Sequence, residues 1–218
     1  MTAVSDISGP ATVTEVLHPL VQHKLGLLRD RSTTTRDFRL LAGELAAFLC
    51  YEATRSLELE PVDVETPLER MTAARVSGKK LGVVAVLRAG VGILDAVLDL
   101  VPVARVGFVG LYRDEATLMP VEYYCKLPGD LAERDVIVLD PMLATGGSAS
   151  AAITLCKNQG ARRVTMVSLV AAPVGVARLQ EDHPDVEIVV AAVDRGLNEQ
   201  GYILPGLGDA GDRLYGTR

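Results

Sequence analysis

The residues best suited to chemistry lie in one short segment, 136–149, where a strand, a loop and a helix are expected in succession. The apolar run 136–139 predicts a buried strand, and the alanine-rich stretch after the loop predicts a helix. Asp140 stands at the end of the strand, and Gly146 and Gly147 precede the helix. Because glycine has no Cβ, the backbone there can turn tightly and approach a ligand closely.

The expected start of this helix offers donors to an anion. The N–H groups from Thr145 to Ser148 have no partners within the helix, and the positive end of the helix dipole lies there. The hydroxyls of Thr145 and Ser148 add two more donors. Asp140 would repel a phosphate, but its carboxylate can accept hydrogen bonds from two sugar hydroxyls. The segment therefore favours a ribose 5-phosphate site, although a plain Gly-Gly turn with a capping Asp fits the same residues.

Two other phosphate-binding motifs fit this loop less well. A Walker A loop requires a Lys before its Ser or Thr, and no Lys follows Gly147. A dinucleotide-binding loop requires three spaced glycines, whereas this loop has one adjacent pair.

The elements that must position this loop are repeated strand–helix units that begin at Leu81. Strands are expected at 81–87, 105–111, 136–139, 164–172 and 186–193, and helices at 93–100, 149–158 and 174–181. Continuous apolar strands that alternate with helices are typical of a parallel sheet covered on both faces. Since ligands bind at the carboxyl ends of such strands, the residues that directly follow them are candidates for the site.

Arginines follow two of these strands. Arg88 precedes Gly90 and Gly92, where a guanidinium and a closely approaching backbone suit a diphosphate. Arg113 lies at the base of a hairpin, 112–128, whose polar tip would make it a lid that closes over the substrate. A plain turn and an ordinary surface hairpin are the alternatives, and Lys126 is a weaker candidate.

The segment after the last strand, 194–218, is rich in Gly and Pro, which predicts a fixed irregular path rather than a helix. Such a backbone exposes N–H and C=O groups that suit a flat base such as uracil. Its apolar side chains require burial, which argues against a disordered terminus: Tyr202, Ile203, Leu204 and Leu207.

The part before Leu81 is expected to be scaffold. Residues 1–12 predict a loose terminus. The apolar spacing in 13–29 predicts one amphipathic helix, and that of Phe38, Leu41, Leu45, Phe48 and Leu49 predicts a second, capped by one of the threonines 33–35. The alternation in 57–64, with Pro61 inside it, predicts an edge strand or a hairpin arm.

Composition limits the function further. The length of 218 residues suits one globular domain. The net charge of −6 disfavours nucleic-acid binding. The three widely spaced cysteines argue against a disulfide framework, and the three histidines have no metal-ligand spacing. No apolar run approaches the length of a membrane span or marks a signal peptide. We therefore expect a cytoplasmic protein without a membrane partner.

The run from Asp140 to Ser148 resembles the phosphoribosyl diphosphate (PRPP) loop of the type I phosphoribosyltransferases. Pro141, where many relatives have a second acid, resembles the uracil phosphoribosyltransferases in particular, and so does the tail from Gly201 to Asp212. The resemblance runs from about His18 to Thr217. It implies an α/β fold of the type I phosphoribosyltransferase kind, a single domain over 1–218 with N-terminal helices in 13–56. It also implies the activity, which is conversion of uracil and PRPP to UMP and diphosphate in pyrimidine salvage.

The resemblance also assigns the site. It gives catalytic roles to Arg88, Arg113 and Asp209, with Asp209 near PRPP and reaching Mg²⁺ through water. PRPP would contact these three residues and the loop, namely Asp140, Pro141, Met142, Leu143, Ala144, Thr145, Gly146, Gly147 and Ser148. Uracil would contact Ile203, Gly208, Asp209 and Ala210.

The resemblance leaves further properties open. It implies a homodimer or a homotetramer, and it raises GTP as an activator, as in some family members. Two other functions are a regulator that keeps the fold but acts on RNA, and a purine transferase. The acidic charge disfavours the first, and the tail disfavours both.

Overall fold

A computed structural model describes residues 12–78, 81–113 and 120–217. Its centre is an eight-stranded sheet in the order β1-β10-β9-β7-β4-β5-β6, with β8 paired to β9. The strands are β1 (Val13–Glu15), β4 (Leu81–Leu87), β5 (Arg105–Arg113), β6 (Pro120–Lys126), β7 (Asp135–Leu139), β8 (Met142–Leu143), β9 (Arg163–Ala171) and β10 (Glu187–Val193).

All neighbouring strands of this sheet run parallel except β5 and β6, which are antiparallel. The prediction of a central parallel sheet flanked by helices is confirmed, with one antiparallel edge strand that makes the sheet mixed. The arms of the predicted lid, 112–128, lie in β5 and β6 and are therefore part of the sheet. The tip, 114–119, lies outside the described residues, as do residues 1–11.

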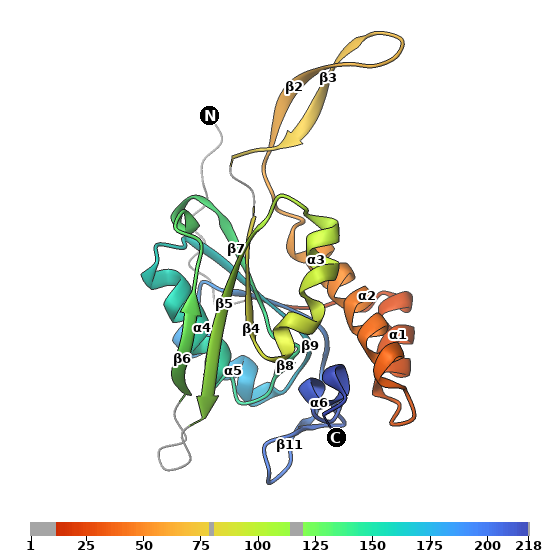
Figure 1. Ribbon diagram of the computed structural model, residues 1–218, viewed down its shortest axis with the longest axis vertical. Coiled ribbons are helices and arrows are strands. Elements are labelled where there is room, and N and C mark those ends of the chain that lie inside the picture. Colours follow the sequence, from red (N-terminus) through yellow and green to blue (C-terminus); the bar gives the residue numbers. More distant parts are fainter. Residues whose placement is uncertain (1–11, 79–80, 114–119, 218) are drawn as a thin grey trace.

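Helices cover both faces of the sheet (Figure 1). One face carries α1 (Pro19–Arg29), α2 (Thr35–Ala53) and α3 (Leu94–Leu100), and the other carries α4 (Gly147–Asn158) and α5 (Pro173–Asp182). Successive strand residues point to opposite faces, so Val83 packs with the first group of helices and Val84 with the second. Short 3-10 turns lie at η1 (Ala89–Ile93) and η2 (Leu131–Glu133), and α6 (Ala210–Tyr215) is the last helix.

The N-terminal part differs from the prediction at its start. Val13–Glu15 is a strand that pairs in parallel with Ile188–Val190, because an open sheet edge is available there. The helix begins only at Pro19, a residue favoured in the first turn, with His18 as its N-cap. Thr34 caps α2 by accepting the Asp37 N–H, which confirms that a threonine in 33–35 begins that helix.

The hairpin of β2 (Leu59–Glu65) and β3 (Arg70–Val76) projects far from the rest of the molecule (Figure 1). It confirms the predicted hairpin arm. Its apolar side chains are exposed, with 95% of Leu68 accessible at the tip. The opposite end of the molecule, where α6 and β11 (Gly196–Leu197) lie, receives the carboxyl ends of the parallel strands.

Within the described ranges, no helix combines the length and the apolar character that crossing a membrane requires.

Candidate active site

The phosphate loop has the geometry that its sequence predicts. Gly146 has a φ of 79° and is the N-cap of α4, which begins at Gly147. A Cβ on Gly146 would lie 2.9 Å from the carbonyl oxygen of Gly175, the first turn of α5. Only glycine therefore fits this position, both for its left-handed backbone and for the contact. The first N–H groups of α4 are left to face a ligand.

Asp140 lies directly after β7 and is not the cap of α4, which has no side-chain cap. Its Oδ1 accepts the N–H of Met142 at 3.2 Å. Burial raises the pKa of this carboxyl to about 6, although the Met142 hydrogen bond acts in the opposite direction. A carboxyl that burial makes costly to ionise, at the carboxyl end of a strand, is typical of a functional position.

Arg88 follows β4 with its side chain 63% exposed, and its Nη2 lies 4.0 Å from Oδ1 of Asp212. The Leu87–Arg88 peptide is cis. The hydroxyl of Tyr215 donates a hydrogen bond to the Arg88 carbonyl at 3.0 Å, and partial burial raises the pKa of that phenol. Arg88 is therefore tied to α6 through both its guanidinium and its backbone carbonyl.

The glycines after Arg88 also permit contacts within the protein that the sequence did not suggest. A Cβ on Gly90 would lie 2.4 Å from the carbonyl oxygen of Leu139, and one on Gly92 would lie 2.7 Å from Leu214. The close approach that they permit is to β7 and to α6. These two glycines thus bring the loop after β4, 88–92, against the end of β7, where the phosphate loop 140–148 begins, and against α6 in the tail.

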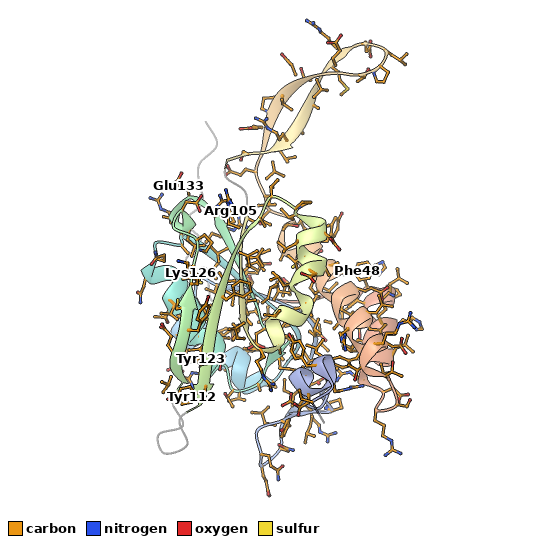
Figure 2. The ribbon with its side chains drawn as sticks, in the orientation of Figure 1. Phe48, Arg105, Tyr112, Tyr123, Lys126 and Glu133 are labelled. Atoms are coloured by element: carbon orange, nitrogen blue, oxygen red, sulfur yellow. The ribbon has the colours of Figure 1, made fainter. Side chains whose placement is uncertain are left out.

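The backbone of Arg113 ends β5, while its side chain lies outside the described residues. The neighbouring part of the hairpin is built from aromatic rings. Figure 2 shows Tyr112 on β5 beside Tyr123 on β6, and their ring centroids are 6.4 Å apart. The ring of Tyr123 covers Gly110, where a Cβ would lie 2.5 Å from it.

The tail is ordered and returns to the body of the protein. Residues of β11 pair with β12 (Ile203–Leu204), and Ile203 and Leu207 are buried as predicted. Tyr202 is 38% exposed, so the prediction that it is buried was wrong. The prediction of no helix was wrong at 210–215, because Asp209 caps α6 through the Asp212 N–H at 2.9 Å and offsets the local glycines.

The loop after β4, the phosphate loop and the tail all contribute residues to one cavity of about 250 Å³. Its lining comprises Ala89, Asp140, Met142, Ala144, Gly201, Tyr202, Ile203, Gly208, Asp209, Ala210 and Gly211. All four residues predicted to contact uracil are among them, together with three from the PRPP loop. Pro141 and Leu143 are instead buried beneath the loop, and Arg88 does not line the cavity.

Magnesium is the metal that the resemblance implies for this cavity. Among the residues that the structure describes, no group of three His, Cys, Asp or Glu could hold a metal. Two carboxylates, Asp140 and Asp209, nevertheless line the cavity together. Carboxylate oxygens suit Mg²⁺, which keeps several waters and binds through substrate phosphates. The cavity therefore fits a metal that arrives with its substrate.

Sequence reasoning missed residues that hold the site from outside it. Arg29 on α1 pairs with Asp194, and Arg178 on α5 lies beside Gly147. Neither follows a strand, and each meets the site only through the tertiary fold. Tyr202 was assigned to the core rather than to the cavity, where it lies.

Comparison with known proteins agrees with this geometry. The sequence profile described as uracil phosphoribosyltransferase matches residues 15–217. A uracil phosphoribosyltransferase of Finegoldia magna is 57% identical over 206 residues, which cover 94% of this chain and 99% of that protein. One of Clostridium botulinum is 56% identical with the same coverage. The structure of protein AQ2163 from Aquifex aeolicus superposes with a TM-score of 0.89 at 40% identity, covering 94% of this chain and 98% of that one.

Proposed function

This chain belongs to the uracil phosphoribosyltransferase family, and on that premise we propose that it transfers the phosphoribosyl group of PRPP to N1 of uracil. The products are UMP and diphosphate, so the reaction returns a free base to the pyrimidine nucleotides. One observation supports this function above the others: the cavity joins Asp140 and Ala144 of the phosphate loop to Gly208 and Ala210 of the tail.

The tail supplies groups for the base. Gly208 has a φ of 73° and lies outside the helices and strands, where no described residue forms a hydrogen bond with its N–H or C=O. These groups, with the backbone of Ile203 and Ala210, can pair with the alternating donors and acceptors of uracil. A base with a different edge would leave buried polar groups unpaired, which is costly and therefore selective.

The phosphate loop holds the sugar phosphate. The N–H groups at the start of α4 and the hydroxyls of Thr145 and Ser148 bind the 5-phosphate, and Asp140 accepts hydrogen bonds from the ribose hydroxyls. This arrangement fixes C1 of the ribose beside N1 of the base. Holding two reactants in line replaces a bimolecular encounter and lowers the barrier.

In the reaction, the bond from C1 to the diphosphate oxygen breaks and a bond from C1 to N1 forms, while the proton of N1 is taken up by the departing diphosphate. The transition state is oxocarbenium-like, so negative charge develops on the departing diphosphate. Arg88, together with Arg113 from the end of β5, stabilises that charge. Asp209 would hold Mg²⁺ through water, and the metal would supply further positive charge to the departing diphosphate.

The proposal also covers the oligomeric state, the cellular location and activation by GTP. A homodimer or homotetramer is supported by the projecting β2–β3 hairpin, whose exposed Leu59, Leu68 and Met71 require a surface to cover them. A cytoplasmic location is supported by three free thiols at Cys50, Cys125 and Cys156. Activation by GTP stays a prediction from the resemblance, and adding GTP to the assay below tests it.

The test offers uracil, cytosine, hypoxanthine and orotate to the purified protein with PRPP and Mg²⁺. Turnover of uracil alone is expected, because the tail selects the base. Turnover of hypoxanthine would favour the purine transferase. If no base reacts while PRPP still binds, the regulator that acts on RNA becomes the better account.

A further inference from the structure

Arg178, in the middle of α5, lies against the phosphate loop. A Cβ placed on Gly147 would lie 3.5 Å from its Nη1 and 3.9 Å from Oγ1 of Thr145. A Cβ on Gly146 would lie 3.2 Å from the Cβ of Arg178. The guanidinium and the Thr145 hydroxyl therefore lie close to the same point at the start of α4.

A carboxylate holds the guanidinium in this place. Nε of Arg178 donates to Oδ2 of Asp182 at 3.3 Å, and the same oxygen accepts the hydroxyl hydrogen of Ser150 at 2.6 Å. Ser150 lies in the first turn of α4, and its hydrogen bond is the main reason that the pKa of Asp182 is lowered. Asp182 thus connects Arg178 to the helix start that the 5-phosphate is proposed to occupy.

The other end of the guanidinium is available to a ligand. Arg178 has 41% of its side chain exposed, and no residue of the described chain accepts a hydrogen bond from its two terminal nitrogens. These nitrogens form a planar fork that matches two oxygens of a phosphate.

The loop needs such a cation. From Asp140 to Ser148 it contains neither Lys nor Arg, so its own contribution is limited to N–H groups and hydroxyls. A phosphate monoester carries more than one negative charge near neutral pH, and the buried carboxyl of Asp140 adds to the negative potential nearby. A guanidinium beside Gly147 offsets both.

We infer that Arg178 binds the 5-phosphate, an inference that rests on the proposed function of the loop. The 5-phosphate is present in PRPP and in UMP, and it does not change during the reaction. A contact with it stabilises substrate, transition state and nucleotide product equally, so its loss raises KM for PRPP without lowering kcat. Binding of diphosphate and of uracil is independent of it.

The test compares Arg178→Gln with the unchanged protein, and Arg55→Gln is the matched control. Arg55 is likewise an exposed arginine paired with a carboxylate one helical turn away, Glu52, and it lies just beyond the C-terminal end of α2. We expect the Kd of UMP and the KM of PRPP to rise about tenfold in Arg178→Gln, as for loss of one charge-assisted hydrogen bond. The value of kcat and inhibition by diphosphate stay within twofold. Arg178→Lys, which keeps the charge but not the fork, falls between.

Other outcomes overturn the inference. UMP and PRPP constants within twofold of the unchanged protein contradict it, and so does a loss confined to kcat. Calorimetric titration with UMP and with uridine tests the inference about Arg178 separately from the proposed function, because the titration needs no turnover. The unchanged protein could make no UMP while Arg178→Gln binds UMP tenfold more weakly and uridine with the same affinity. In that case the inference about Arg178 is upheld and the proposed catalytic function fails. If the unchanged protein binds no UMP, both fail.

Discussion

Asp194 accepts two hydrogen bonds from the guanidinium of Arg29, at 2.7 and 2.9 Å, although 165 positions separate them in the sequence. Asp194 is 7% exposed and begins the tail, while Arg29 ends α1. Both residues also bind Gly206: the Gly206 N–H donates to Oδ2 of Asp194, and the Gly206 carbonyl oxygen accepts from Nη1 of Arg29, each at 2.9 Å. The path of the tail, which is proposed to bind the base, is therefore set by the N-terminal helix α1.

Replacing Asp194 with Asn should loosen the tail and weaken uracil binding. Breaking one side of a buried ion pair costs roughly 3 kcal/mol when the remaining charge keeps some access to water, as Arg29 does. We expect KM for uracil to rise at least tenfold, with a smaller change in KM for PRPP. Steady-state kinetics and chemical denaturation measure the two effects.

Glu52→Gln is the control for this change, because it removes one partner of a surface pair between the half-buried Glu52, near the end of α2, and the exposed Arg55. Its free energy of unfolding should change by about 1 kcal/mol at most, and its KM values should not change. Equal uracil KM values in Asp194→Asn and in the unchanged protein would show that the tail is held by other contacts.

Gly90→Ala should disrupt the junction between the diphosphate loop and β7. The added Cβ would lie 2.4 Å from the Leu139 carbonyl oxygen, so the backbone must move, at a cost of about 1–3 kcal/mol. The movement displaces Arg88, and kcat should fall more than tenfold. Gly26→Ala is the control, since Gly26 lies on exposed α1 with nothing near its Cβ. It should stabilise the fold by about 0.5–1 kcal/mol and leave kcat unchanged.

The pH dependence of PRPP binding should report on Asp140. Its pKa is raised to about 6 by burial, and only the ionised carboxylate accepts hydrogen bonds from both ribose hydroxyls. In the unliganded enzyme the affinity for PRPP should therefore fall as the pH drops through 6. Titrations of PRPP from pH 5 to pH 8 measure this change, and an inflection that persists in Asp140→Asn would assign it to another group.

The same carboxyl should affect stability in the opposite sense. Its pKa is near 3.8 in the unfolded chain and near 6 in the folded one, so between these values the folded state binds more protons. Stability conferred by this group is thus highest below pH 4 and is lost as the pH rises to 6. Asp140→Asn should stabilise the unliganded protein more at pH 8 than at pH 5. Thermal unfolding at the two pH values decides, and a larger gain at pH 5 would contradict the burial of the charge.

Arg113→Ala tests the lid that the sequence predicts after β5. If Arg113 stabilises the departing diphosphate, kcat falls much more than uracil binding weakens, because the contact develops mainly in the transition state. Single-turnover kinetics with saturating PRPP separate the two quantities. An unchanged kcat would leave Arg88 as the arginine that acts on the leaving group.

How much of this site the sequence could predict depends on distance along the chain. The phosphate loop is a local device, since Gly146, Gly147 and the start of α4 are neighbours whose geometry follows from their own residue types. The meeting of Asp140 with Gly208 and Ala210 follows from the resemblance and from the rule that ligands bind at the carboxyl ends of strands.

The supports of the site could not be predicted in this way. Arg29 and Arg178 each lie on a helix and carry no local signal, because their partners are chosen by how helices pack. The contact of Gly90 could not be predicted for the same reason, since its neighbour Leu139 is on β7, the strand beside β4, and Gly90 follows β4 in the turn η1. The helix at 210–215 escaped notice because one cap, Asp209, outweighs the glycines around it.

One cavity is proposed to bring uracil and PRPP together for transfer. The most direct test of this proposal is to follow UMP and diphosphate at the same time, with the purified protein, Mg²⁺, PRPP and uracil. UMP and diphosphate should appear in equal amounts, and neither should appear when uracil is left out. Diphosphate release without UMP, or no release with any base, would contradict it.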